Sequence, residues 1–352
     1  MAKTILGIDV GFHSVKGVAL SGTGKTCALT RAAIVPQNAL ADPIQQTTDK
    51  ALATAIKELL SQLKAAKGEC HIAFNSPTAV LRYVESPMYT HADLRDSLRL
   101  NHQTYLRQTF ENFTFDGLCV GSEPEAAKKQ KAEADKAGAT RKGKAVIAGL
   151  PQFEINLLWN GARGAGLKPT SLTLSPISLM NAFELAYPAE YHESSVLLMD
   201  IGHLTTSLTI LSKGATFLTR VVALGGRAAW DYLVQSQGGV AQAETARNEG
   251  GNALGEAIQA SFDPLFREVR SSINFFERNT DTDMRKIYLS GTLVKSPRAV
   301  EVLQECLGIP CETWNPAQGM QVNLPPGQLE LFSENQAAFG PCIGAARFFC
   351  GN

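Results

Sequence analysis

LGIDVGFHSVKGVAL (residues 6–20) and LLMDIGHLTTSLTIL (residues 197–211) share one pattern. Each is an apolar run that ends in an Asp and a Gly, followed by small or hydroxylated residues and a second apolar run. Two such runs joined by a short Gly-containing turn predict a pair of antiparallel strands. Backbone amides in a turn of this kind can point at an anion, and an Asp at its mouth suits a hydrated divalent cation. The repeated pattern therefore predicts two turns that face each other and hold the phosphates of a nucleotide with its Mg²⁺.

The elements expected around the two turns also repeat. The chain begins with a predicted three-stranded meander, and the spacing of apolar residues predicts a helix over residues 50–67 and a strand over residues 70–75. The same succession recurs from Ser195, with strands to about Val222, helices to about Asn279 and then a further strand. A repeat of fold without a repeat of sequence indicates two similar α/β lobes around a cleft.

The segment between the two halves does not follow this succession. It contains an apolar stretch at residues 79–87, a predicted helix over residues 91–109, a polar stretch, and a predicted strand over residues 144–151. A helix closed by Gly164 and Gly166 is expected next. The charged residues 123–144 predict a solvated loop or a fraying helix, with a basic docking tail for an acidic partner as the alternative.

Composition limits the classes of function. With 33 basic and 33 acidic residues the formal net charge is zero, which gives no electrostatic case for binding nucleic acid or an anionic membrane. No apolar run approaches the roughly 20 residues that span a bilayer, so we expect a soluble, cytoplasmic protein. The 7 cysteines stand at irregular spacing and predict reduced thiols rather than a disulfide framework. A chain of 352 residues that is 44% hydrophobic suffices for two lobes with cores of their own.

The two hairpins resemble the phosphate-1 and phosphate-2 motifs of the actin-like ATPase superfamily. Within that superfamily the chain is most similar to the PilM family of type IV pilus assembly proteins. Further motifs of the superfamily match in the expected order, so the resemblance covers nearly the whole chain. The matches are VALGGRAAWDYL (residues 222–233) to the paired-glycine turn, AETARNEG (243–250) to the next helix, residues 287–320 to the adenosine-motif strand with its helix and following strand, and AAFGPCIGAARF (337–348) to the closing helix.

This resemblance implies an α/β, actin-like (ribonuclease H-like) fold of two lobes with an inserted subdomain of the FtsA and PilM type. The first lobe is expected from residues 1–81, 164–194 and 337–352, and the insertion from residues 82–163. The second lobe is expected to have its core in residues 195–224 and 285–336 and a helical subdomain in residues 225–284.

The resemblance also assigns roles to single residues. Asp9 and Asp200 would bind Mg²⁺ through water and Lys16 would face a phosphate, although an Asp often caps its own turn and a strand Lys is often simply exposed. Glu244 and Arg247 would face the ribose and adenine, or would form a surface ion pair. The other nucleotide contacts that it implies are Gly11, Phe12, His13, Ser14, Gly202, His203, Thr205, Thr206, Gly225, Gly226, Arg227, Gly291 and Thr292.

Several positions depart from the family pattern. The adenosine motif of PilM-like proteins usually continues with glycines, whereas here Thr292 and Leu293 follow Gly291. Where small residues are common, the two hairpin turns carry Phe12, His13, His203 and Leu204. We therefore expect a weakened site for ATP and Mg²⁺. The connecting segment of the family often has an acidic residue before its helix, whereas residues 171–183 have Thr173 and Ser175 there and retain only Pro176. No carboxylate that could orient an attacking water is visible in this segment, so we expect ATP hydrolysis to be weak or absent.

The implied function is that of a cytoplasmic scaffold in type IV pilus assembly, recruited to the inner membrane by protein partners. Such a scaffold binds the N-terminal peptide of a PilN-like inner-membrane protein as an extended segment, in a groove between the first lobe and the insertion, and contacts the pilus motor ATPases. One alternative is an enzyme of the same superfamily, a small-molecule kinase or phosphatase, which would need a catalytic Asp or Glu in the cleft. The other is a scaffold of type II secretion or of cell division. An FtsA-like division protein would end in an amphipathic membrane helix, for which AARFFCGN (345–352) is too short.

Overall fold

The computed structural model describes residues 4–22, 27–36, 44–65, 68–87, 89–120, 142–249 and 251–347. The chain forms two compact units, one made of Met1–Pro77 with Leu157–Asn352 and the other of Thr78–Asn156. Most of the charged stretch at residues 123–144 lies outside the described residues. Among the described helices, none is both long enough and apolar enough to cross a membrane.

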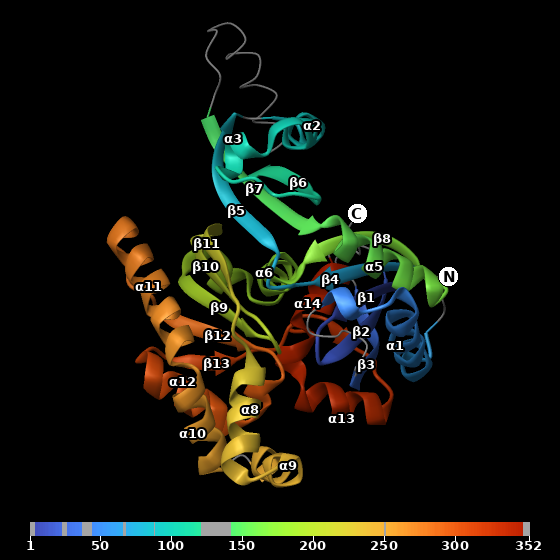
Figure 1. Ribbon diagram of the computed structural model, residues 1–352, viewed down its shortest axis with the longest axis vertical. Coiled ribbons are helices and arrows are strands. Elements are labelled where there is room, and N and C mark those ends of the chain that lie inside the picture. Colours follow the sequence, from blue (N-terminus) through green and yellow to red (C-terminus); the bar gives the residue numbers. More distant parts are fainter. Residues whose placement is uncertain are drawn as a thin grey trace, which may run out of the picture. The chain divides into compact units, whose positions relative to one another are not determined.

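The larger unit contains a six-stranded sheet built on the first hairpin (Figure 1). Strand β1 pairs antiparallel with β2 and parallel with β4. Strand order is β14-β3-β2-β1-β4-β8. The strands are β1 (Thr4–Val10), β2 (Ser14–Ser21), β3 (Ala28–Pro36), β4 (Glu69–Phe74), β8 (Lys168–Leu174) and β14 (Gln321–Val322).

Helices α1 (Asp49–Leu63) and α14 (Gly340–Arg347) cover opposite faces of this sheet. A Cβ on Gly7 would lie 2.0 Å from the carbonyl oxygen of Cys342 in α14, whereas a Cβ on Gly17 would lie 2.8 Å from Leu59 in α1. Gly17 pairs with Ile8, the neighbour of Gly7, so the two glycines lie on opposite faces. Close packing on both faces buries β1 and β2 almost completely and holds the first hairpin in place.

The second sheet of the larger unit repeats the topology of the first. Its strand order is β11-β10-β9-β12-β13, which matches β3-β2-β1-β4-β8 strand for strand. The central strand again pairs antiparallel with the next strand along the chain and parallel with a later one. The strands are β9 (Ser195–Ile201), β10 (Thr206–Ser212), β11 (Ala215–Val222), β12 (Lys286–Ser290) and β13 (Cys311–Thr313).

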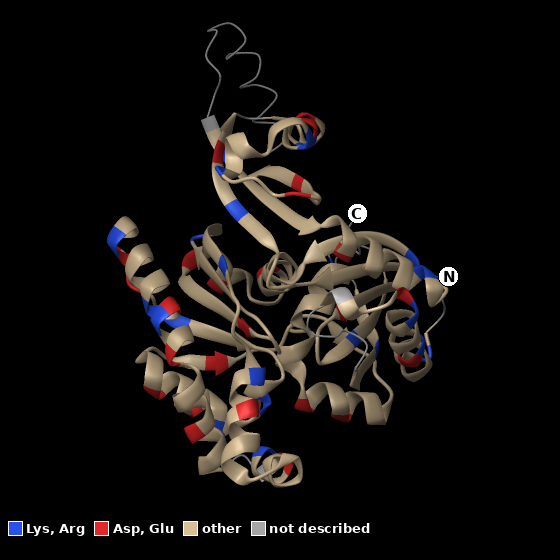
Figure 2. Ribbon diagram, viewed as in Figure 1, with Lys and Arg blue, Asp and Glu red and all other residues tan. Residues whose placement is uncertain are grey.

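Alternate residues of β9 face two separate cores. Leu197 and Met199 pack with helices that follow the sheet, whereas Val196 and Leu198 pack with the helices that precede it. The helices before β9 are α6 (Ser175–Ala186) and α7 (Pro188–Glu193), and those after the hairpin are α8 (Gly226–Gln237), α9 (Val240–Glu249), α10 (Asn252–Ser261), α11 (Asp263–Thr280) and α12 (Pro297–Leu307). Acidic and basic residues alternate along α11 (Figure 2).

The smaller unit is a three-stranded antiparallel sheet with helices on one face. Strand order is β5-β7-β6, and Leu94 and Leu98 of α2 pack on Phe115 and Ile147 of the sheet. The elements are β5 (Val80–Pro87), α2 (His91–Asn101), α3 (Gln103–Leu106), β6 (Phe113–Val120) and β7 (Lys142–Pro151). Helix α5 (Gln152–Gly164) begins in this unit and ends in the larger one. The remaining elements are η1 (Ile44–Gln46), η2 (Leu293–Lys295), α13 (Pro326–Glu334) and η3 (Gln336–Phe339).

The structure corrects several expectations about these elements. The single helix expected over residues 91–109 is two helices, interrupted at His102 and ended by Arg107 in the left-handed conformation. Strands β6 and β8 were not expected. Strand β14 pairs with β3 of the first sheet, although its residues belong to a segment expected in the second lobe. The two hairpins and the repeated succession of elements are confirmed.

Candidate functional site: a cleft between two hairpin turns

The two hairpin turns have the same hydrogen-bonding pattern. The Gly11 amide donates to the carbonyl of Ser14 at 3.1 Å, and the Gly202 amide donates to the carbonyl of Thr205 at 2.9 Å. In the described part of the chain, no backbone carbonyl accepts from the amides of Phe12 and His13 in the first turn or of Leu204 in the second. Each turn therefore ends in backbone donors that can meet an anion.

Asp9 and Lys16 are buried side by side at the base of the first turn. They face each other across β1 and β2, and Lys16 Nζ donates to Asp9 Oδ2 at 2.8 Å. The hydroxyl of Ser175, at the start of α6, lies 3.5 Å from Asp9 Oδ1. Burial lowers the pKa of Lys16, but the carboxylates of Asp9 and Asp200 outweigh it, so the pKa of Lys16 is raised overall. Lys16 is therefore a fixed positive charge beneath the turn.

Asp200 occupies the corresponding position in the second hairpin. It lies directly before Ile201, the last residue of β9, as Asp9 lies directly before Val10, the last residue of β1. Burial and then the negative charge of Asp9 raise the pKa of Asp200 to about 7, against the opposing effect of Lys16. A divalent cation would relieve this repulsion on the Asp200 carboxylate, so the pair of Asp9 and Asp200 fits Mg²⁺.

A cleft of about 1300 Å³ lies between the hairpins, which is large enough for a nucleotide. All but three of the residues singled out from the sequence line it. They are Asp9, Gly11, Phe12, His13, Ser14, Lys16, Asp200, Gly202, His203, Thr205, Gly226, Glu244, Arg247, Gly291 and Thr292.

The three other residues hold the second turn from behind. The hydroxyl of Thr206 donates to the carbonyl of Leu224 at 2.8 Å, and a Cβ on Gly225 would lie 2.5 Å from the carbonyl oxygen of Gly202. The Arg227 amide donates to the carbonyl of His203 at 2.9 Å, and the Arg227 side chain lies 3.4 Å from Asp231. The first amides of α8 are thus engaged with the turn, which fixes the turn against the helix.

Helix α9 contributes a stacked pair rather than the alternative ion pair between Glu244 and Arg247. The guanidinium of Arg247 lies over the ring of Trp230 in α8, 5.0 Å from its centroid. A cation held against an aromatic face is stabilised by about 0.5–1 kcal/mol at an exposed site. Trp230 lines the cleft and was not among the residues singled out from the sequence, since a Trp within a helix is typical of ordinary packing.

Asn75 is a second cleft residue that the sequence did not single out. It follows β4 directly, and its side-chain amide donates to the hydroxyl of Thr205 at 3.4 Å, which connects the two halves of the cleft. Its Oδ1 atom is buried, and within the described part of the chain it has no hydrogen-bond partner. A buried acceptor without a partner at the wall of a cleft is consistent with a ligand or hydrated cation there. Its position at the carboxyl end of a parallel strand was the one signal that the sequence held.

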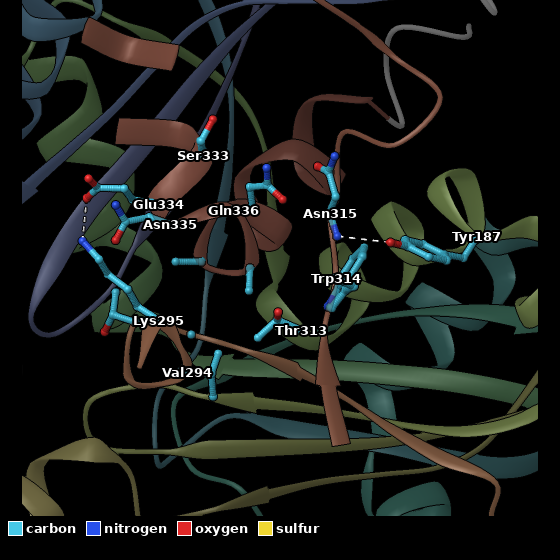
Figure 3. A pocket seen from close by; sticks show the side chains of 14 residues that line it. Tyr187, Val294, Lys295, Thr313, Trp314, Asn315, Ser333, Glu334, Asn335 and Gln336 are labelled. Carbon is cyan, nitrogen blue, oxygen red and sulfur yellow. Dashed lines mark hydrogen bonds and ion pairs between the residues drawn. The ribbon is translucent and has the colours of Figure 1, made fainter. Parts of the chain in front are cut away.

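A second cavity of about 390 Å³ lies beyond the turn that follows β12 (Figure 3). Gly291 and Thr292 of this turn line both the cavity and the cleft, so the turn is a wall between them. On one side of the cavity Lys295 pairs with Glu334 at 2.7 Å, and on the other the Asn315 amide donates to the Tyr187 hydroxyl at 3.3 Å (Figure 3).

The backbone of this turn leaves little room for change. Gly291 has φ +105°, and a Cβ there would lie 2.1 Å from the carbonyl oxygen of Ile201. Glycine is therefore required at this point. The next two residues, Thr292 and Leu293, also line the cleft.

The paired sheets, each with a hairpin and an Asp at the mouth of one cleft, define the actin-like ATPase fold. Two solved structures with this fold are similar over nearly the whole chain. The ethanolamine utilization protein EutJ from Carboxydothermus hydrogenoformans is 13% identical with a TM-score of 0.51, over 99% of this chain and 90% of that one. MreB5 of Spiroplasma citri, solved bound to ADP, is 11% identical with a TM-score of 0.50, over 98% and 96%.

Within this class, the family model described as type IV pilus assembly protein PilM matches residues 7–346. The chain belongs to the PilM family. A chain of a solved structure described as "PilM-PilN type IV pilus biogenesis complex" is 24% identical with a TM-score of 0.82, over 99% of this chain and 98% of that one. The resemblance inferred from the hairpin motifs, and the actin-like fold inferred with it, are confirmed.

Proposed function

We propose that the chain is a cytoplasmic scaffold of a type IV pilus assembly machine that binds Mg-ATP in the cleft and an N-terminal peptide of a PilN-like membrane protein elsewhere on its surface. The observation that supports it most is the family match over residues 7–346, which takes in both hairpins and the whole cleft. Recruitment to the inner membrane would come through the protein partner.

Nucleotide binding is supported by the arrangement of charges in the cleft. Bound Mg²⁺ would neutralise phosphate charge, and Asp9 and Asp200 would hold the ion through water. Lys16 would face a phosphate from beneath the first turn, and the tip amides of both turns would donate to phosphate oxygens. Arg247 on its Trp230 platform would contact the nucleoside.

A scaffold is favoured over a kinase or phosphatase by the side chain next to Asp9. Ser175 begins α6 with its hydroxyl 3.5 Å from Asp9 Oδ1, in the segment where the resemblance implies an acidic residue before the helix. A hydroxyl at this place cannot take a proton from water as a carboxylate does. Bound ATP would then act by favouring one arrangement of the two lobes, which requires different affinity for the two arrangements.

The proposed partner rests on the similar chain that was solved as part of a PilM-PilN complex. The peptide would dock as an extended segment against groove and sheet edge, and the assembled complex would connect to the pilus motor ATPases.

Calorimetric titration with a PilN-type N-terminal peptide, in the presence and absence of Mg-ATP, tests the proposal. Saturable binding of the peptide and not of a scrambled peptide of the same composition is the expected result. A different affinity with and without Mg-ATP is expected if the nucleotide sets the lobe arrangement. Absence of peptide binding under both conditions would overturn the scaffold proposal.

A further inference from the structure

The two hairpin turns are in contact through two histidine side chains. His13 belongs to the first turn and His203 to the second, and their rings stack with centroids 5.1 Å apart and planes inclined by 23°. Both residues line the cleft. The stack therefore joins the two turns at the place where their tip amides would receive an anion.

Charged groups of both signs surround this stack. Lys16 of β2 and Arg247 of α9 are positive, whereas Asp9 and Asp200 are negative and line the same cleft. Burial, and after it the charges of Arg247 and Lys16, lower the pKa of His13. Two imidazolium rings in stacking contact would also repel each other, so the stack favours neutral rings when the cleft holds no anion.

A phosphate changes this balance. Each protonated imidazole has two N–H donors and a positive charge, so it forms strong hydrogen bonds to phosphate oxygens. Without an anion, the protonated rings would be repelled by each other and by Lys16 and Arg247. An anion between the turns would attract all of these positive charges. The rings would then be charged in the bound state and neutral in the empty one.

We propose that His13 and His203 form a phosphate-binding pair, separating from their stack and taking up protons when a polyphosphate group enters between the turns. The inference rests on the proposed nucleotide site, and to that site it adds a specific role for the two imidazole side chains and a coupling of phosphate binding to protons. The recognised chemistry is a di- or triphosphate, whether free or part of a nucleotide.

The sign of the pH dependence follows from linkage. Phosphate binding raises the pKa of each imidazole above its value in the empty cleft, so affinity is greatest below the empty-cleft pKa and falls as the pH rises through the bound-state pKa. The dissociation constant changes by up to tenfold per pH unit for each proton taken up. Asp200, which faces the same cleft, would also take up a proton, and its share must be separated by substitution.

Calorimetric titrations at pH 6.0 to 8.0, in buffers of different ionisation enthalpy, give both the dissociation constant and the number of protons bound. Pyrophosphate, Mg-ADP and adenosine are the three ligands. The wild-type protein is expected to take up protons with pyrophosphate and with Mg-ADP but not with adenosine. His13→Asn and His203→Asn should each remove part of that uptake and flatten the pH dependence, whereas Asp200→Asn should retain the histidine part. His192→Asn, a substitution on α7, serves as the matched control and should behave as the wild type.

The outcomes separate this inference from the proposed nucleotide site. Binding of Mg-ADP without proton uptake, or with uptake that both histidine variants retain, would overturn the inference and leave the nucleotide site standing. Binding of pyrophosphate with proton uptake that the histidine variants lose, together with no binding of Mg-ADP, would support the histidine pair and overturn the nucleotide site. Failure of the wild type to bind either phosphate compound would overturn both.

Discussion

Removal of the Lys16 charge is expected to destabilise the larger unit strongly. The Lys16 and Asp9 side chains are 11% and 9% exposed and are joined at 2.8 Å. Lys16→Met retains most of the apolar stem but leaves the Asp9 carboxylate buried without its partner. Breaking a buried ion pair in this way costs about 3–5 kcal/mol, so the free energy of unfolding should fall by that amount.

A double-mutant cycle tests the physical reason. Asp9→Asn in the Lys16→Met background removes the unpaired charge, so the two changes together should cost less than the sum of the single changes by about 2 kcal/mol. The exposed pair of Arg267 and Asp263, at 2.6 Å on α11, is the matched control. Its side chains are 67% and 60% exposed, so its coupling should not exceed about 0.5 kcal/mol.

The assay is urea unfolding followed by circular dichroism, with the free energy of unfolding compared among the variants. Agreement requires a large cost for Lys16→Met and a coupling well above that of the control pair. A cost below about 1 kcal/mol, or a coupling equal to that of the control, would show that Asp9 is solvated and would refute the account of a buried charge pair.

Three further predictions concern stability and binding. The raised pKa of Asp200 means that the stability it contributes is present below its ordinary pKa of 3.8 and is lost as the pH rises through about 7. A pKa difference of this size corresponds to about 4 kcal/mol, so Asp200→Asn should be more stable than the wild type by about that amount at pH 8 and nearly equal to it at pH 4 in urea titrations. Gly344→Ala places a Cβ 1.8 Å from a backbone carbonyl oxygen of α6 and should lower the free energy of unfolding by at least about 2 kcal/mol. The Cβ of Gly327→Ala meets nothing within 4 Å, so this control should be neutral or slightly stabilising. Equal melting temperatures for the two variants would contradict the packing account. Trp230→Leu removes the aromatic ring beneath Arg247 and should weaken Mg-ATP binding about 2- to 5-fold. Trp230→Phe keeps an aromatic ring and should bind with an affinity nearer to that of the wild type. Equal calorimetric affinities for the wild type and both variants would contradict a role of Trp230 in nucleotide binding.

The parts of the fold that the sequence predicted are those with strong local signals. The two hairpins combine apolar strands with an Asp-Gly turn, and both form the expected antiparallel pairs. Strand β6 was missed because Asp116 and Gly117 interrupt its alternation, and β8 because Pro169 and its hydroxylated residues are typical of a loop. Nothing in the sequence at His102 marks the helix boundary that the structure has there, and the His102 ring accepts from the amide of Phe110, eight residues further along the chain.

The cleft could be predicted in part for the same reason. Residues carried by the hairpin motifs, such as Asp9 and Asp200, were accessible from the pattern alone. Trp230 lies in the cleft only because separate helices bring it there, so no local signal distinguishes it from a packing residue, and the one signal for Asn75 is its position directly after a strand. The stack of His13 on His203 likewise depends on the distance between two turns that are far apart in the sequence.

The measurement that tests the central claim most directly is calorimetric titration of the purified protein with Mg-ATP, beside Asp9→Ala, Asp200→Ala and the surface control Asp263→Ala. The paired hairpins predict micromolar binding to the wild type and the control, with loss of at least tenfold in affinity in each of the two cleft variants. Absence of binding to the wild type, or equal affinity in all four proteins, would contradict a Mg-nucleotide site between the two turns.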